Sequence, residues 1–355
     1  MRRALPIALL AGCLLAFAPA AGASYDPLAS GTATLTLDRS FAAYLKANGI
    51  QLSATAPARR QGAKLTLPVS GGEWDPTTGK GSAETEGAIV FTGRKRVPLR
   101  ELVVKAKPTP LLARVGGGQL KVASSKRVMP ARLGFGAKLT ATKLLLTAKV
   151  ATRLNKKLRP GTPFRAGQVI GRLTATVAPA TVAVLPQGRA YVTPTPEIRA
   201  KLDALFVSVN PIAPAELAPG PVFSLPIGPE SQIAPDGSSG TLHTTGTLEF
   251  LQLGAGQVFW AEQWLDLAAR GDSAEVNLQP SPPFGGKQGR VGVLALGGGT
   301  VSADPKTRTV SVNGASLTLS ESAAGAFNEA FAQGKPPIFA AGEVLGSLSF
   351  TAQGQ

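Results

Sequence analysis

The chain repeats a long stretch of its own sequence, and this repeat constrains the fold more than any other feature. Residues 164–174 read FRAGQVIGRLT, and residues 339–349 read FAAGEVLGSLS. Looser matches pair 81–91 with 240–250 and 41–45 with 198–202. A repeat of this length is a domain rather than a short solenoid unit. The sequence therefore predicts two tandem domains, over 24–177 and 195–355, joined by a proline-containing linker over 178–194.

Most of each copy is typical of short strands. Alternating or continuous apolar runs, such as 65–69, 99–104 and 139–146, are separated by turns rich in Gly and Pro. Each copy also contains two helix signals, in which a capping residue precedes a helix-forming run: Asp38 before 39–48, Thr147 before 148–158, Thr195 before Pro196, and Ser320 before 321–332. This pattern predicts an all-β protein of two antiparallel β-sandwich-like domains, each with two short α-helices.

The first 23 residues have the layout of a signal peptide. Arg2 and Arg3 precede an apolar run over 4–17, and small residues over 21–23 fit a cleavage site. We expect a protein that is secreted or associated with the cell surface. The letters LAGC, ending at Cys13, also fit a lipoprotein box that would leave this cysteine acylated, but the apolar run continues beyond it, which favours simple secretion. No later stretch is long enough for a transmembrane segment.

The sequence offers little for catalysis. Cys13 is the one cysteine and His243 the one histidine of the chain. A catalytic Ser–His–acid set, a thiolate site or a multi-histidine metal site therefore has almost nothing to build on. His243 itself stands in a predicted strand and needs no special role. We predict that the protein is not an enzyme.

Charge divides the two copies. Residues 24–185 contain 26 Lys/Arg and 7 Asp/Glu, a balance of +19, whereas residues 186–355 contain 9 and 14, a balance of −5. This contrast points to an anionic partner for the first copy, either an envelope polymer, an anionic lipid or a ligand that carries propionates. A purely solubilising role stays open. Specific nucleic-acid binding is not expected, because aromatic residues are few and no known module is present.

Two segments of the first copy resemble a known family. Residues 31–45 read GTATLTLDRSFAAYL, and residues 87–94 read GAIVFTGR. Together they resemble the HtaA domain family, exported actinobacterial envelope domains, often in tandem, that bind haem. The resemblance extends over about 31–104. It is weaker in the second copy, where the matching places Leu202 at the position of the family tyrosine.

The resemblance implies a site. The family's Ser-Phe-x-x-Tyr element matches Ser40, Phe41 and Tyr44, and its tyrosine ligates the haem iron, which implies that role for Tyr44. The family histidine that supports the tyrosine is replaced by Arg94. This arginine would lower the pKa of Tyr44 by its charge or pair with a haem propionate. It would equally suit a domain that kept the fold and lost the ligand, with Tyr44 as a core residue beside Phe41 and Leu45.

Two functional hypotheses follow. The first is haem binding and relay through Tyr44 of the first copy in the cell envelope. The second is a non-catalytic structural or adhesive envelope protein that binds anionic polymers through its basic first copy. The oligomeric state is not determined by the sequence.

Overall fold

The computed structural model describes residues 25–106, 111–115, 118–254, 256–267, 272–278, 289–332 and 335–355. The expected signal peptide over 1–23 and the lipoprotein cysteine Cys13 lie outside the described residues. Within these ranges no helix is both long enough and apolar enough to cross a membrane.

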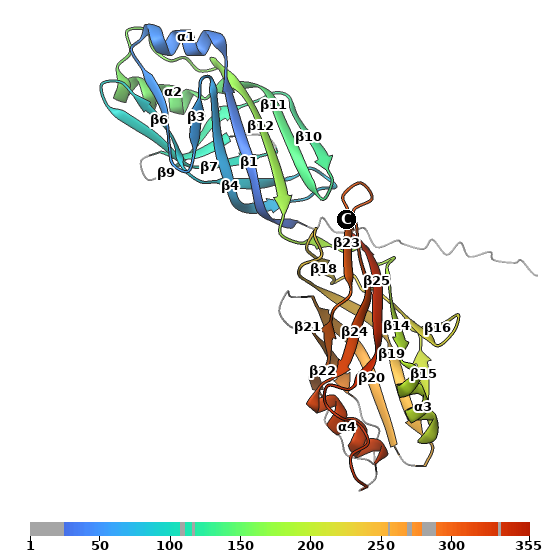
Figure 1. The fold of residues 1–355 in the computed structure, drawn as a ribbon. Helices are drawn as coiled ribbons and strands as arrows, with labels where there is room; N and C mark the ends of the chain where they lie inside the picture. The colour runs from blue at the N-terminus through green and yellow to red at the C-terminus, as the bar shows by residue number, and fades with distance from the viewer. Residues whose placement is uncertain are drawn as a thin grey trace, which may run out of the picture.

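The described strands form two sheets that lie end to end, and the helices of each sheet lie at the end away from the other (Figure 1). We call residues 25–179 the first half and residues 182–355 the second half. The all-β class that the sequence predicts is thus confirmed.

The first half is one sheet that curls back and closes on itself. Along its main path the strands follow the order β2-β6-β7-β5-β4-β1-β12-β11-β9-β8, and β8 also pairs with β7. This second pairing gives a barrel-like sheet, whereas the sequence suggested two stacked sheets. The elements are β1 (Asp26–Leu37), α1 (Arg39–Ala47), β2 (Gln51–Thr55), β3 (Arg59–Gln61), β4 (Lys64–Trp74), β5 (Gly81–Thr85), β6 (Ala88–Thr92), β7 (Arg96–Lys105), β8 (Leu111–Val115), β9 (Gly118–Ser124), β10 (Val128–Leu133), β11 (Gly136–Leu146), α2 (Ala148–Leu158) and β12 (Val169–Pro179).

The second half repeats this plan. Its elements are β13 (Val182–Ala183), β14 (Arg189–Pro194), α3 (Pro196–Ala204), β15 (Val207–Ile212), β16 (Glu216–Ala218), β17 (Val222–Pro226), β18 (Gln232–Ile233), β19 (Gly240–Gln252), β20 (Gly256–Asp266), β21 (Asp272–Leu278), β22 (Gly289–Gly297), β23 (Thr300–Asp304), β24 (Thr309–Leu319), α4 (Glu321–Phe331) and β25 (Val344–Gln353). Strands β13 and β14 belong to its sheet. The predicted linker over 178–194 therefore contains strands, and the connection between the sheets is short.

Local signals placed the helices well. Asp38, Thr195 and Ser320 each accept a hydrogen bond from a backbone N–H in the first turn of α1, α3 and α4, which is the capping that the sequence predicted. Thr147 differs, because its hydroxyl donates to the Lys121 backbone oxygen rather than capping α2.

Each half has its own hydrophobic core. Helix α1 buries Phe41 and Leu45 against the open end of the first sheet. Burial of an apolar side chain of this size stabilises the fold by about 1.5–3 kcal/mol. The core therefore fixes which face of α1 points inward and leaves its other residues at the surface.

Candidate functional site

Four aromatic rings gather where α1 meets the first sheet. Tyr44 lies with its ring centroid 5.0 Å from that of Phe164 and 6.1 Å from that of Phe41. Phe91 on β6 packs edge-on against Phe164 at 6.4 Å. The two segments that resemble the HtaA family thus meet in space, and the repeated segment that begins at Phe164 joins them.

The Tyr44 hydroxyl is held by the loop that follows α2. It donates a hydrogen bond of 2.6 Å to the Thr162 backbone oxygen. Asn48 braces the same loop, because its Oδ1 accepts from the Thr162 N–H at 2.8 Å while its Nδ2 donates to the Tyr44 backbone oxygen at 2.9 Å. Burial raises the pKa of Tyr44 above its ordinary value. The phenol is therefore protonated at neutral pH.

The other two residues implied by the resemblance lie at the rim. Ser40 is exposed and donates through its backbone N–H and its hydroxyl to Asp38. These hydrogen bonds lower the pKa of Asp38. Arg94 is exposed in the turn between β6 and β7, where its backbone N–H reaches the Leu158 oxygen at 3.5 Å. Among the described residues, no hydrogen bond joins Ser40 or Arg94 to the Tyr44 side chain.

Phe164 is a part of this site that motif reading missed. It is buried, and Asn155 on α2 holds its backbone, accepting from its N–H at 2.7 Å and donating to its oxygen at 2.9 Å. In the second half, Asn328 holds Phe339 in the same way at 2.9 and 2.8 Å. The sequence did contain a signal for this contact: each repeated segment begins with a Phe, and an Asn lies in the predicted helix before it.

Lys201 occupies the place of Tyr44 in the second half. Helices α1 and α3 have matching caps and bury Phe41 and Leu45 in one case and Ile198 and Leu202 in the other. Counted from these caps, Tyr44 corresponds to Lys201. The expectation that Leu202 stands at the tyrosine position is therefore corrected.

Like the Tyr44 hydroxyl, the Lys201 side chain donates a hydrogen bond to the loop that follows the second helix of its half. Its Nζ donates to the Ile338 backbone oxygen at 3.1 Å, lies 5.2 Å from the ring centroid of Phe339, and forms an ion pair with Glu343. The second half thus ties its helix to the same loop without a phenol.

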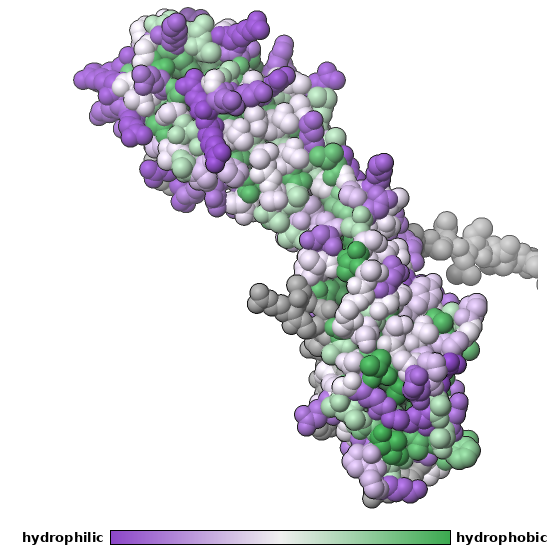
Figure 2. Space-filling model, in the orientation of Figure 1, coloured by the Kyte–Doolittle hydropathy of each residue, from purple (hydrophilic) through white to green (hydrophobic). Residues whose placement is uncertain are grey.

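The surface around Tyr44 is strongly basic. We define the cationic tip as residues 38–50, 91–97 and 147–170, which contain eleven Lys/Arg and one carboxylate, Asp38. Ten of the eleven are exposed, and none belongs to an ion pair in the described part of the chain. Figure 2 shows hydrophilic side chains projecting from this end of the molecule. A positive potential of this density attracts anions.

The matching end of the second half has the opposite character. Its described segments, 195–207, 250–254, 320–332 and 335–345, contain three Lys/Arg and five Asp/Glu. Since the folds of the two ends match, the basic character of the first is a property of its sequence and not a requirement of the architecture.

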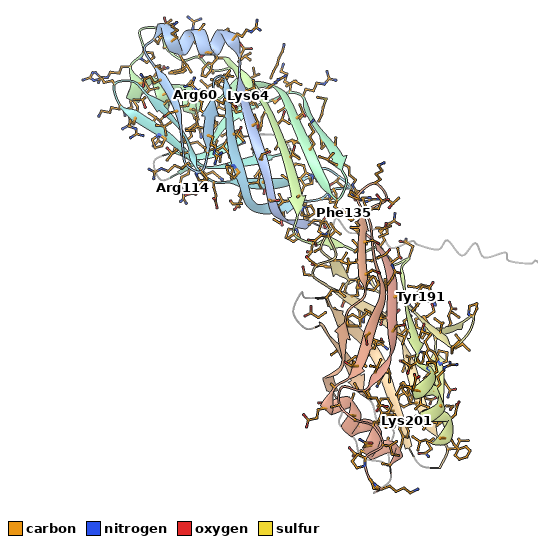
Figure 3. All side chains as sticks on the ribbon, viewed as in Figure 1. Arg60, Lys64, Arg114, Phe135, Tyr191 and Lys201 are labelled. Atoms are coloured by element: carbon orange, nitrogen blue, oxygen red, sulfur yellow. The ribbon has the colours of Figure 1, made fainter. Side chains whose placement is uncertain are left out.

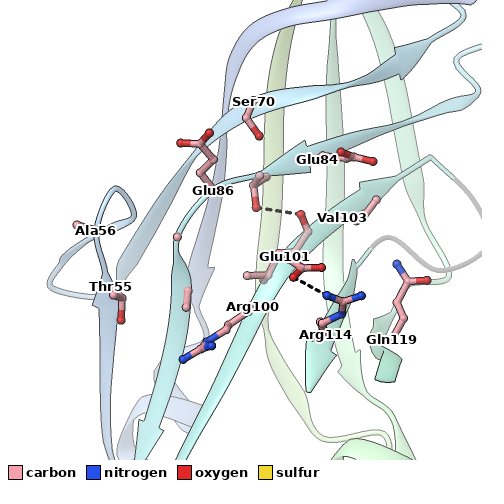
Figure 4. A pocket seen from close by; sticks show the side chains of 14 residues that line it. Thr55, Ala56, Ser70, Glu84, Glu86, Arg100, Glu101, Val103, Arg114 and Gln119 are labelled. Atoms are coloured by element: carbon pink, nitrogen blue, oxygen red, sulfur yellow. Dashed lines mark hydrogen bonds and ion pairs between the residues drawn. The ribbon is translucent and has the colours of Figure 1, made fainter. Parts of the chain in front are cut away.

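A polar cleft lies elsewhere on the first half (Figure 4). It has a volume of about 850 Å³ and includes Glu84, Glu86 and Arg100 among its lining residues. Within it, Arg114 pairs with Glu101 at 2.9 Å. Over the residues that the structure describes, no group of three or more His, Cys, Asp or Glu is arranged to hold a metal ion.

No protein-family model matches the chain. No curated protein matches it in sequence. Among solved structures, the chain is similar to the C-terminal domain of HtaA from Corynebacterium glutamicum, at 15% identity and a TM-score of 0.39, over 48% of this chain and 98% of that one. It is also similar to the N-terminal domain of the same protein, at 13% identity and a TM-score of 0.37, over the same shares of the two chains. Both of these solved structures are HtaA domains, the family that residues 31–104 resemble in sequence.

Proposed function

We propose that the chain is an exported, non-catalytic, HtaA-like binding protein of the cell envelope, and that the cationic tip binds haem at Tyr44. One observation carries the proposal: the tyrosine and three phenylalanines gather beneath a surface with eleven cations and one carboxylate.

The residues of the tip fit the chemistry of haem. A flat apolar macrocycle suits the half-buried aromatic ring of Tyr44, which the buried ring of Phe164 supports from below. Its propionates suit the exposed guanidinium groups of Arg94, Arg159 and Arg165, which form strong, charge-assisted hydrogen bonds with carboxylates. The phenolic oxygen of Tyr44 is the ligand type found in tyrosine-bound haem. When bound, haem would supply a ferric centre that acts as a Lewis acid.

The protein's own contribution is to position Tyr44. Its proton lies in the hydrogen bond to Thr162, and burial raises its pKa, so binding requires that this proton leave. Arg94, exposed at the rim, would pair with a propionate and not with the phenol, whose pKa is raised by burial. Asn48 and Asn155 keep the loop fixed while this happens.

The test is a hemin titration of the intact chain, followed by gel filtration to remove loosely associated hemin. We expect a Soret band that co-elutes with the protein, and an affinity lowered by more than about tenfold in Tyr44→Phe. Tyr191→Phe is the matched control, because Tyr191 is an exposed tyrosine on β14 of the second half. Equal binding by both variants would remove Tyr44 from the site.

A second function is favoured by the contrast between the two ends. The eleven cations of the tip form no ion pair within the described ranges, and such a surface suits a linear polyanion as well as a small anion. The test is retention of the intact chain on an acidic resin across a salt series. The double variant Lys156→Glu/Lys157→Glu should elute earlier than Lys138→Glu/Lys143→Glu, which makes the same charge change on β11 outside the tip. Equal elution of the two would show that only net charge matters.

A further inference from the structure

The two halves meet at a junction that buries side chains from both. We define the junction by Asp26, Arg132 and Phe135 of the first half and by Ala183 and Arg308 of the second. Phe135, in the turn between β10 and β11, packs into the core of the second half (Figure 3).

Backbone packing makes the junction close. A Cβ built on Gly354, beside the end of β25, would lie 2.9 Å from a Val182 methyl group and 3.5 Å from the ring of Phe135. A Cβ on Gly134 would lie 3.1 Å from Pro305. The two halves are therefore in direct van der Waals contact here. Side chains buried between them are shielded from water.

Asp26 is a carboxylate buried in this junction. It is 2% exposed at the start of β1. Its Oδ1 accepts a hydrogen bond of 3.3 Å from the Ala183 N–H, which belongs to the second half. Its Oδ2 is buried and has no hydrogen-bond partner among the described residues. A charged carboxylate with one long hydrogen bond is poorly compensated for the water it has lost.

The charged groups that face Asp26 come from several elements. Arg132 on β10 attracts it, and Asp75, buried in the turn after β4, repels it. Arg132 is itself shared, since its Nη2 donates to the Gln355 backbone oxygen at 2.9 Å and Arg308 of the second half repels it. Asp75 is held by the N–H groups of its own turn. Among the residues that the structure describes, Arg132 is thus the one cation that attracts Asp26, and it is shared with the Gln355 oxygen.

We propose that the junction is a pH-sensitive clamp, in which the two halves hold together more firmly when Asp26 is protonated than when it is charged. Opening the junction returns Asp26 to water, where its charge is no longer costly. Proton uptake therefore favours the closed arrangement. The inference concerns the junction alone and does not depend on what the cationic tip binds.

The direction and pH range follow from the burial. Burial raises the pKa of Asp26 from 3.8 to about 6, and Asp75 adds to this, while the Ala183 hydrogen bond and Arg132 oppose it. For a carboxyl group with a raised pKa, the closed state binds the proton more tightly. Its contribution to closure is full below the ordinary pKa and is lost as the pH rises through about 6. A shift of about two pKa units corresponds to a change of about 100-fold in the ratio of closed to open molecules.

The test is small-angle X-ray scattering of the intact chain at fixed ionic strength between pH 4.5 and 8. We expect the radius of gyration to increase with pH in the parent protein. Asp26→Asn, which stays neutral, should remain compact throughout. Asp236→Asn removes an exposed carboxylate in a turn of the second half and should behave as the parent. Arg132→Gln removes the attracting cation and should move the transition to higher pH.

The outcomes separate clearly. Persistence of the full pH response in Asp26→Asn, or a radius of gyration independent of pH in the parent, would overturn the proposal. If Asp26→Asn does not fold, Arg132→Gln decides, because a transition left at the same pH would show that the field around Asp26 does not control the junction.

Discussion

The Tyr44 hydroxyl and the Thr162 backbone oxygen, 118 residues apart in sequence, are joined by a hydrogen bond of 2.6 Å. The same tie recurs in the second half between Lys201 and Ile338. A polar side chain from the first helix of each half thus fastens the loop after the second helix. In the first half this side chain carries an oxygen that can ligate a metal, and in the second half it carries an ammonium group that cannot.

The tie should contribute measurably to stability. Tyr44→Phe removes the hydroxyl and leaves the ring packed on Phe164, so we expect the free energy of unfolding to fall by about 0.5–1.5 kcal/mol. Urea denaturation followed by circular dichroism measures this. Tyr191→Phe, at an exposed tyrosine, should change it by less than about 0.5 kcal/mol. A Tyr44→Phe variant as stable as the parent would mean that water replaces the bond without loss.

Haem binding through Tyr44 should strengthen with pH. The pKa of Tyr44 lies above its ordinary value of 10.0, so ligation of iron must release a proton throughout the neutral range. The apparent affinity should then rise by about tenfold per pH unit between pH 6 and 9. Hemin titrations across this range measure the slope. A flat profile would instead indicate binding through propionates and cations, whose charges do not change in this range.

The tie at Lys201 should matter more than a surface ion pair. The side chains of Lys201 and Glu343 are 29% and 22% exposed, and Lys201 also lies over Phe339. Lys201→Met keeps the aliphatic stem and should lower the free energy of unfolding by about 1–2 kcal/mol. In the matched variant Arg114→Met, the broken pair with Glu101 is 55% and 62% exposed, and the loss should be below about 1 kcal/mol. Equal losses of stability in the two variants would contradict the idea that burial makes the Lys201 ion pair stronger.

His243 should be replaceable with a gain in stability. Its ring stacks on Trp264 at 4.4 Å, and in the described part of the chain neither of its buried ring nitrogens has a hydrogen-bond partner. His243→Phe preserves a stacked ring and removes these unsatisfied groups, so we expect a gain of about 0.5–1 kcal/mol in thermal or urea unfolding. A loss of more than about 1 kcal/mol would show that the nitrogens have partners in solution.

Local sequence signals were enough for the all-β class, the four helices and the duplication. The start of α3, for example, follows from Thr195 and Pro196, because a cap and a proline in the first turn act within a few residues. Caps and turn residues act on their neighbours in the sequence, so the sequence alone is enough to locate them.

What the sequence left open was settled by contacts between distant segments. The pairing of β7 with β8 closes the first sheet, Phe164 meets Tyr44 across more than a hundred residues, and Asp26 meets Ala183 at the junction. None of these has a local signature, because each depends on which strand edges and loops come together once the whole chain is packed. The sequence by itself determined the elements, the repeat and the uneven charge. The tertiary structure decided which rings surround Tyr44 and which carboxylate is deprived of water, since burial and hydrogen bonding arise only from the complete fold.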